Sequence, residues 1–144
     1  RCAMTFSPTQ PASAAQPLSP APAAPTTILT VDDSRTMRDM LRLTLGAAGF
    51  RVVQAVDGED GLAVLAGETP DVIITDINMP KLDGFGFIAR IRADPRFLGV
   101  PILVLTTESS AQKKSQARQA GATGWIVKPF DADKLVDVVR RVSA

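Results

Sequence analysis

One pattern recurs five times between residues 28 and 144: a short apolar run is followed by a segment of helix length. The runs lie at 28–31, 52–53, 72–74, 102–105 and 125–127. Most are continuously apolar rather than alternating, which is typical of strands buried on both faces of a parallel sheet. Strands that alternate with helices predict an α/β fold, in which right-handed crossovers place helices on both faces of the sheet.

The helix-length segments differ in how much apolar surface they offer. The segment 35–48 carries apolar residues at helical spacing and ends before Gly49, a typical helix stop. Shorter helices are predicted after the second run and from about Gly84, and Asp131 is placed to cap the last helix. A helix over 110–120 offers little but alanine to a core. We therefore expect this fourth helix to be weakly anchored.

Residues 1–27 differ in composition from the rest of the chain. They hold six of the eleven prolines, seven alanines and a single charge, that of Arg1. Proline at this density removes amide donors and restricts φ, so we expect a disordered or polyproline-like leader. Met4 is a candidate for the natural start, with the first residues added by cloning. One domain is expected over 28–144, where acidic and basic side chains number fifteen each.

The composition excludes several classes of protein. The chain has no histidine, which rules out Ser-His-Asp and Cys-His mechanisms and zinc sites that use histidine. Its single cysteine cannot form an internal disulfide. A net charge of +1 provides no long-range field to attract nucleic acid or an anionic membrane. No run resembles a signal peptide or could cross a bilayer, so we expect a soluble, cytoplasmic protein.

Polar side chains follow the predicted strands at their carboxyl ends, where open α/β sheets bind ligands. Asp32 and Asp33 follow the first strand and Asp76 the third, while Thr106 and Lys128 follow the fourth and fifth. Taken singly, each has an ordinary explanation as a helix cap, a strand residue or a solvated charge. Their joint placement instead favours one site at this edge of the sheet.

The chemistry of these residue types indicates phosphoryl transfer. Clustered carboxylates repel unless a cation neutralises them, and Mg²⁺ suits a site with few carboxylates better than Ca²⁺ does. Lys128 can pair with the central carboxylate and with an incoming phosphoryl group, to which Thr106 can donate a hydrogen bond. Asp76 is the predicted nucleophile because its strand lies between the acidic pair and Lys128.

Sequence motifs over 28–144 resemble the receiver domains of two-component response regulators, especially the single-domain chemotaxis regulators of the CheY type. The matching pieces are Val-Asp-Asp-Ser at 31–34, Thr-Asp-Ile-Asn-Met-Pro at 75–80, Asp-Gly at 83–84, Val-Leu-Thr at 104–106 and Gly-Ala-Thr-Gly-Trp-Ile-Val-Lys-Pro-Phe at 121–130. The resemblance implies a flavodoxin-like, doubly wound sheet of five parallel strands in the order 2-1-3-4-5, with five helices in a three-layer α/β/α arrangement.

The resemblance also implies roles for the site residues. Asp76 would accept a phosphoryl group from the phosphohistidine of a chemotaxis histidine kinase. Asp33, Asp76 and the backbone carbonyl of Asn78 would hold Mg²⁺, and Asp32 would act largely through a metal-bound water. Lys128 and Thr106 would contact the phosphoryl oxygens, and the peptide bond after Lys128 would be cis.

Switching is implied as well. Thr106 would move inward in the active state, and Trp125 would turn from outside to inside with it. From the residues alone, the better interpretation of Trp125 is a strand aromatic that fills space, and only the resemblance reverses that preference. Asn78 and Glu108 lie at the positions that, in such regulators, tune hydrolysis of the phosphate. The fourth helix, fifth strand and fifth helix would form the target surface. Its basic side chains suggest an acidic partner segment, but they are equally ordinary for a solvated face.

Alternative functions follow from the same residues. The first is a phosphorylation-switched monomer that binds the flagellar motor switch and catalyses only its own phosphorylation and dephosphorylation. A phosphatase is a further candidate partner. The second keeps this chemistry but drains phosphate from a shared kinase. A Mg²⁺ phosphohydrolase is disfavoured because Asn78 stands where a second aspartate is expected. A nucleotide- or flavin-binding module is disfavoured by acids where glycines would cradle phosphate.

Overall fold

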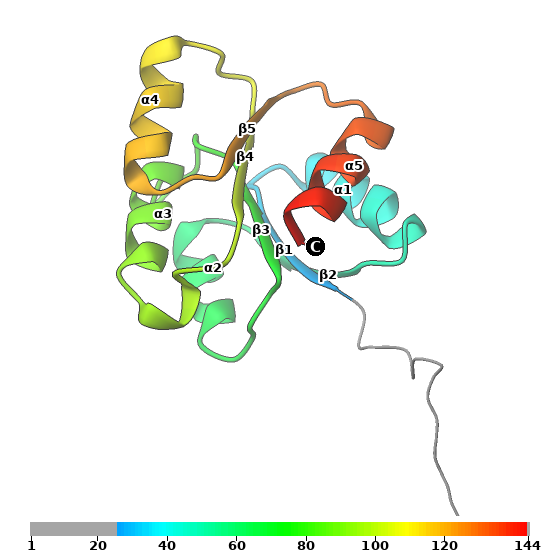
Figure 1. Cartoon of the computed structure of the whole chain (residues 1–144), viewed down its shortest axis with the longest axis horizontal. Helices are drawn as coiled ribbons and strands as arrows, with labels where there is room; N and C mark the ends of the chain where they lie inside the picture. Colours follow the sequence, from blue (N-terminus) through cyan, green and yellow to red (C-terminus); the bar gives the residue numbers. More distant parts are fainter. Residues whose placement is uncertain (1–25, 144) are drawn as a thin grey trace, which may run out of the picture.

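The computed structural model describes residues 26–143 and contains one five-stranded parallel sheet (Figure 1). The strand order is β2-β1-β3-β4-β5, as predicted. The strands are β1 (Thr27–Val31), β2 (Arg51–Ala55), β3 (Val72–Thr75), β4 (Ile102–Thr106) and β5 (Gly124–Val127). From β1 the chain first adds β2 on one side and then β3 on the other, so the order of strands reverses between β1 and β3. The crevice between the carboxyl ends of these two strands is the expected ligand site.

Five α-helices cover the two faces of the sheet, which confirms the three-layer prediction (Figure 1). One face carries α1 (Arg35–Ala47) and α5 (Ala132–Ser143). The other carries α2 (Gly58–Leu65), α3 (Gly84–Arg92) and α4 (Ala111–Ala120). Most of the predicted leader lies outside the described residues, but Thr27, at its end, already belongs to β1.

The core divides into two clusters because successive strand residues point to opposite faces. Leu29 and Ile73 pack beneath α2, α3 and α4, whereas Ile28 and Ile74 pack beneath α1 and α5. All four side chains are at most 1% exposed. The central strands are therefore buried on both faces, as their continuous apolar runs indicate.

Side-chain caps begin the helices where the sequence has short polar residues. Ser34 Oγ accepts the backbone N–H of Met37 at 3.3 Å, so Ser34 rather than Asp33 caps α1. Asp131 Oδ1 accepts the N–H groups of Asp133 and Lys134, as expected of a cap for α5. Asp33 is thereby left available to the site at the end of β1.

Some features differ from the sequence-based expectation. A 3₁₀-helix, η2 (Pro95–Phe97), precedes β4 and was not predicted. The second strand extends over Arg51–Ala55, beyond the apolar pair at 52–53, because an edge strand pairs through backbone even where its side chains are exposed. The fourth helix buries only Ala117, in agreement with its polar sequence. Among residues 26–143, no helix combines the length and apolar character needed to span a membrane.

Candidate functional site

The predicted site residues converge at the carboxyl edge of the sheet. Asp32 and Asp33 follow β1, Asp76 follows β3, Thr106 ends β4 and Lys128 follows β5. Parallel strands place their carboxyl ends at one edge, so residues far apart in sequence meet there.

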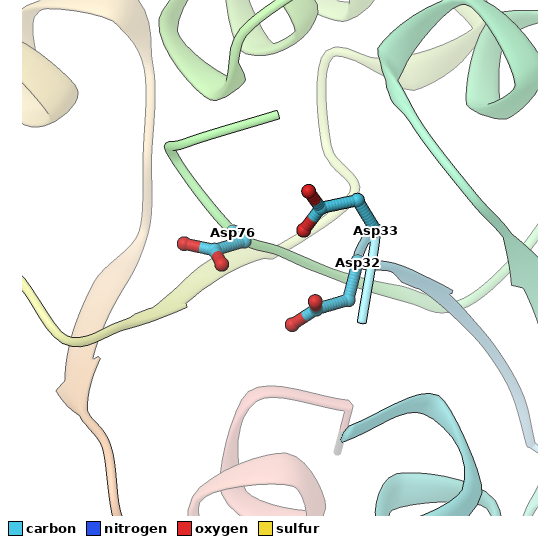
Figure 2. Close-up of side chains that lie close together, drawn as sticks. All are labelled: Asp32, Asp33 and Asp76. Carbon is cyan, nitrogen blue, oxygen red and sulfur yellow. The ribbon is translucent and has the colours of Figure 1, made fainter. Parts of the chain in front are cut away.

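An acidic cluster lies at the centre of this edge. Carboxylate oxygens of Asp32, Asp33 and Asp76 lie within 4.8 Å of one another, and Figure 2 shows the three side chains gathered at the ends of two strands. Asp32 is 2% exposed and Asp76 is 8% exposed, whereas Asp33 is open to solvent. Three oxygen donors with one open side fit Mg²⁺, which prefers carboxylates and retains several waters.

Lys128 joins two members of the acidic cluster. Its Nζ lies 2.8 Å from Asp32 Oδ2 and 3.0 Å from Asp76 Oδ2. Burial would lower the pKa of Lys128, but hydrogen bonds and charge attraction from the two carboxylates outweigh burial and raise that pKa above its ordinary value. The ammonium therefore remains charged at neutral pH and neutralises part of the cluster.

Local backbone geometry holds Asp76 in place. Its Oδ1 accepts the N–H of Ile77 at 2.6 Å, and its own N–H donates to the carbonyl of Val31 at 3.0 Å. Thr75 Oγ1 donates to the Asp76 carbonyl at 2.9 Å. A Cβ at Gly84 would overlap that same carbonyl oxygen, so glycine lets the start of α3 approach the site. The other carboxylate oxygen, Asp76 Oδ2, pairs with Lys128.

The loop between β4 and α4 connects the site to β5. Thr106 is fully buried, and its Oγ1 accepts the N–H of Glu108 at 3.3 Å. The Glu108 carbonyl accepts Trp125 Nε1–H at 3.0 Å, and the Glu108 carboxylate lies 3.4 Å from Lys113 Nζ. Trp125 is half-buried against the core and lies outside the acidic cluster. The indole is therefore hydrogen-bonded to the loop that directly follows Thr106, which carries the predicted switch hydroxyl.

The remaining predicted features have simple placements. Asn78 is exposed, two residues after Asp76. The Lys128–Pro129 peptide bond is cis, as the resemblance implied. Sequence reasoning missed Arg38, whose Nη1 donates to the backbone carbonyl of Asp32 at 2.7 Å. The only available signal was its position one turn after the acidic pair.

Comparison with known families places these observations in context. The protein-family model that describes the response regulator receiver domain matches residues 28–140. The chain belongs to this family. Strand order and the acidic cluster agree with this assignment.

Relatives of this receiver domain have different overall lengths. It is 39% identical over 113 residues to the DNA-binding dual master transcriptional regulator RpaA of Synechocystis sp., covering 78% of this chain but only 47% of that protein. It is 36% identical to the chemotaxis protein CheY of Pseudomonas aeruginosa, covering 80% of this chain and 94% of CheY. The solved structure of Vibrio cholerae CheY4 is 44% identical, with a TM-score of 0.80 over 83% of this chain and 99% of that one.

Proposed function

We propose that Asp76 of this receiver domain accepts a phosphoryl group from the phosphohistidine of a sensor kinase. The carrying observation is that one nearly buried carboxylate is paired with Lys128 and lies beside two further carboxylates. These 144 residues contain no histidine, so the phosphohistidine donor lies outside them. The proposed partner is a chemotaxis histidine kinase, and the proposed location of this protein is the cytoplasm.

The proposed transfer forms one bond and breaks one. A carboxylate oxygen of Asp76 attacks phosphorus in line, while the bond between phosphorus and the donor imidazole nitrogen breaks. The electron pair leaves with the imidazole, which takes up a proton. Lys128 turns from its carboxylate partners to the phosphoryl oxygens, and Thr106 donates its hydroxyl to them once the group is present.

Mg²⁺ is the proposed cofactor, because the donor set is all oxygen. Asp33, Asp76 and the backbone carbonyl of Asn78 would hold it, with Asp32 acting through a bound water. When bound, the ion would neutralise negative charge on the carboxylates and on the transferring group. Asn78 and Glu108 are the proposed residues that set how fast the aspartyl phosphate hydrolyses.

The proposed output is chemotactic. Similarity to the chemotaxis protein CheY of Pseudomonas aeruginosa and to CheY4 of Vibrio cholerae supports this proposal. Phosphorylation would move Thr106 and Trp125 and change the surface of α4, β5 and α5. A flagellar motor switch protein would then bind this surface of the monomeric chain. A phosphate sink for a shared kinase has the same chemistry without this binding.

Labelling tests the acceptor. Wild-type protein with Mg²⁺ and a small acyl phosphate should gain one base-labile phosphoryl group, measured by intact mass, and Asp76→Asn should gain none. Equal labelling of both proteins would refute Asp76 as the acceptor. Continuous release of phosphate from a generic ester would instead favour a phosphohydrolase.

Binding tests the output. A purified motor switch protein should bind the phosphorylated chain at least about tenfold more tightly than the unphosphorylated chain, a coupling of the usual size. Equal affinity for both forms, with normal labelling of Asp76, would favour the phosphate sink.

A further inference from the structure

Arg38, in the second turn of α1, contacts the site through backbone rather than through a carboxylate. Its Nη1 donates to the carbonyl oxygen of Asp32 at 2.7 Å. That carbonyl belongs to the planar peptide unit that joins Asp32 to Asp33. The guanidinium therefore fixes the backbone between two members of the acidic cluster.

The remaining polar atoms of Asp32 are held as well. Its N–H donates to the Ala55 carbonyl at 3.2 Å, and its Oδ1 accepts the N–H of Ser34 at 2.9 Å. Its Oδ2 pairs with Lys128. By contrast, the Asp33 carboxylate is exposed and makes no hydrogen bond or ion pair within residues 26–143. The position of the Asp33 carboxylate therefore depends on the peptide that carries it.

Arg38 is itself anchored from a third element. Gln54 Nε2, on β2, donates to the Arg38 carbonyl at 2.9 Å. Gln54 is the neighbour of Ala55, whose carbonyl accepts the N–H of Asp32. A closed path of hydrogen bonds thus runs from β2 through α1 to the end of β1. The hydrogen bond from Arg38 to the Asp32 carbonyl is the strongest of this path, because a charged donor makes a stronger hydrogen bond than a neutral one.

We propose that Arg38 is a positioning residue for the magnesium site: it holds the Asp32–Asp33 peptide so that the Asp33 carboxylate faces the site. The inference rests on the proposed function, because magnesium binding is part of that function. Groups outside the ligand shell commonly change metal affinity about 10- to 100-fold when they are removed.

Two effects of Arg38 on magnesium affinity have opposite signs. Its positive charge repels a divalent cation, so loss of charge alone would tighten binding. Its hydrogen bond places a ligand, so loss of positioning would weaken binding. The direction of the change therefore separates a positioning residue from a bystander charge.

The experiment is titration calorimetry of Mg²⁺ into the full chain and four variants. Arg38→Met, which keeps the aliphatic stem, should bind Mg²⁺ about tenfold more weakly. Arg38→Lys, which keeps a charged donor, should recover part of the loss. Gln54→Met, which frees the far end of the path, should weaken binding by a smaller factor. Circular dichroism at the same temperature verifies that each variant is folded.

Arg35→Met is the matched control. Arg35 lies on the same helix, closer to the acidic pair in sequence, is exposed and makes no side-chain hydrogen bond or ion pair in the described chain. Its loss removes the same charge without touching the path, so Mg²⁺ affinity should stay equal or rise slightly.

The outcomes separate the two claims. If the wild type binds Mg²⁺ and Arg38→Met binds it equally or more tightly, the positioning role is wrong and the proposed function stands. If the wild type binds no Mg²⁺, both fail. Should Arg38→Met not fold, unchanged affinity in both Arg38→Lys and Gln54→Met would overturn the inference.

Discussion

At the scale of single residues, Lys128 is where the ion pairs of the site converge. Its ammonium forms ion pairs with Oδ2 of both Asp32 and Asp76, two carboxylates on which the proposed chemistry depends. A cation held there neutralises the carboxylates in the resting state and is available to an incoming phosphoryl group. The same charge also opposes a second cation nearby.

Replacing Lys128 by Met should therefore change two properties in opposite directions. Mg²⁺ affinity should rise at least about fivefold, because a neighbouring unit charge contributes on the order of 1 kcal/mol even when partly screened. Labelling of Asp76 by an acyl phosphate should fall at least about a hundredfold, since a donor to the phosphoryl oxygens is lost. Calorimetry and intact mass measure the two; a parallel loss of both would contradict this account of Lys128.

Thr30 is a buried residue with an unsatisfied group. It lies on β1 at 0% exposure, and its Oγ1 has no hydrogen-bond partner within the described chain. Thr30→Val keeps the side-chain shape and removes the hydroxyl, so the free energy of unfolding should rise by about 1 kcal/mol. Chemical denaturation measures it.

Thr75 provides the control for Thr30. It is equally buried on the adjacent β3, but its Oγ1 donates to the Asp76 carbonyl at 2.9 Å. Thr75→Val should therefore lower the free energy of unfolding, by about 1 kcal/mol. The same sign for both variants would mean that the hydrogen bond is not what distinguishes them.

At the scale of elements, α4 buries little apolar surface and is anchored at its C-terminal end. Its one buried residue is Ala117, whereas α1 and α5 bury leucines. At the C-terminus, Gly121 adopts φ +117 and its carbonyl accepts Arg92 Nε–H at 3.0 Å. Arg92 also donates to the carbonyl of Phe97 at 2.6 Å, so one guanidinium joins α3, η2 and the end of α4.

Hydrogen exchange should reveal this arrangement. Amides of α4 should exchange faster than those of α1 and α5, because little apolar surface opposes local opening. Arg92→Met should speed exchange at the end of α4 about tenfold, since a hydrogen bond from a charged group contributes roughly 1.5 kcal/mol or more. Arg90→Met, at an exposed position on α3, should leave it unchanged; equal effects of both variants would refute the Arg92 anchor.

At the scale of the whole molecule, the acidic cluster connects ion binding to folding. Its carboxylates come from the ends of β1 and β3, which meet only in the folded chain. A ligand that binds only the folded state raises stability by RT ln(1 + [L]/Kd), about 2.7 kcal/mol at a hundredfold excess over Kd.

Saturating Mg²⁺ should therefore raise the thermal midpoint of the wild type by several degrees, measured by differential scanning calorimetry. Asp33→Asn should lose most of this increase, because it removes the solvent-facing donor. A control with Na⁺ at equal ionic strength separates binding from screening. An equal rise in Asp33→Asn and the wild type would place the ion elsewhere.

The sequence by itself predicted the fold class and predicted that the site residues lie close together. Continuous apolar runs alternating with helices predicted a parallel sheet with two covered faces, and parallel strands bring their carboxyl ends to one edge. Residues that directly follow strands, such as Asp32, Asp76 and Lys128, could therefore be placed together without coordinates. The strand order came from the family resemblance rather than from the residues.

Only the tertiary structure decided which partner each long side chain takes. Lys128 is shared between Asp32 and Asp76, Arg38 reaches the Asp32 carbonyl, and the Trp125 indole reaches that of Glu108. Every residue has a backbone carbonyl, so nothing in a sequence distinguishes the one that a distant arginine or tryptophan will contact. That choice is made when helices settle on the sheet and leave particular carbonyls within hydrogen-bond reach.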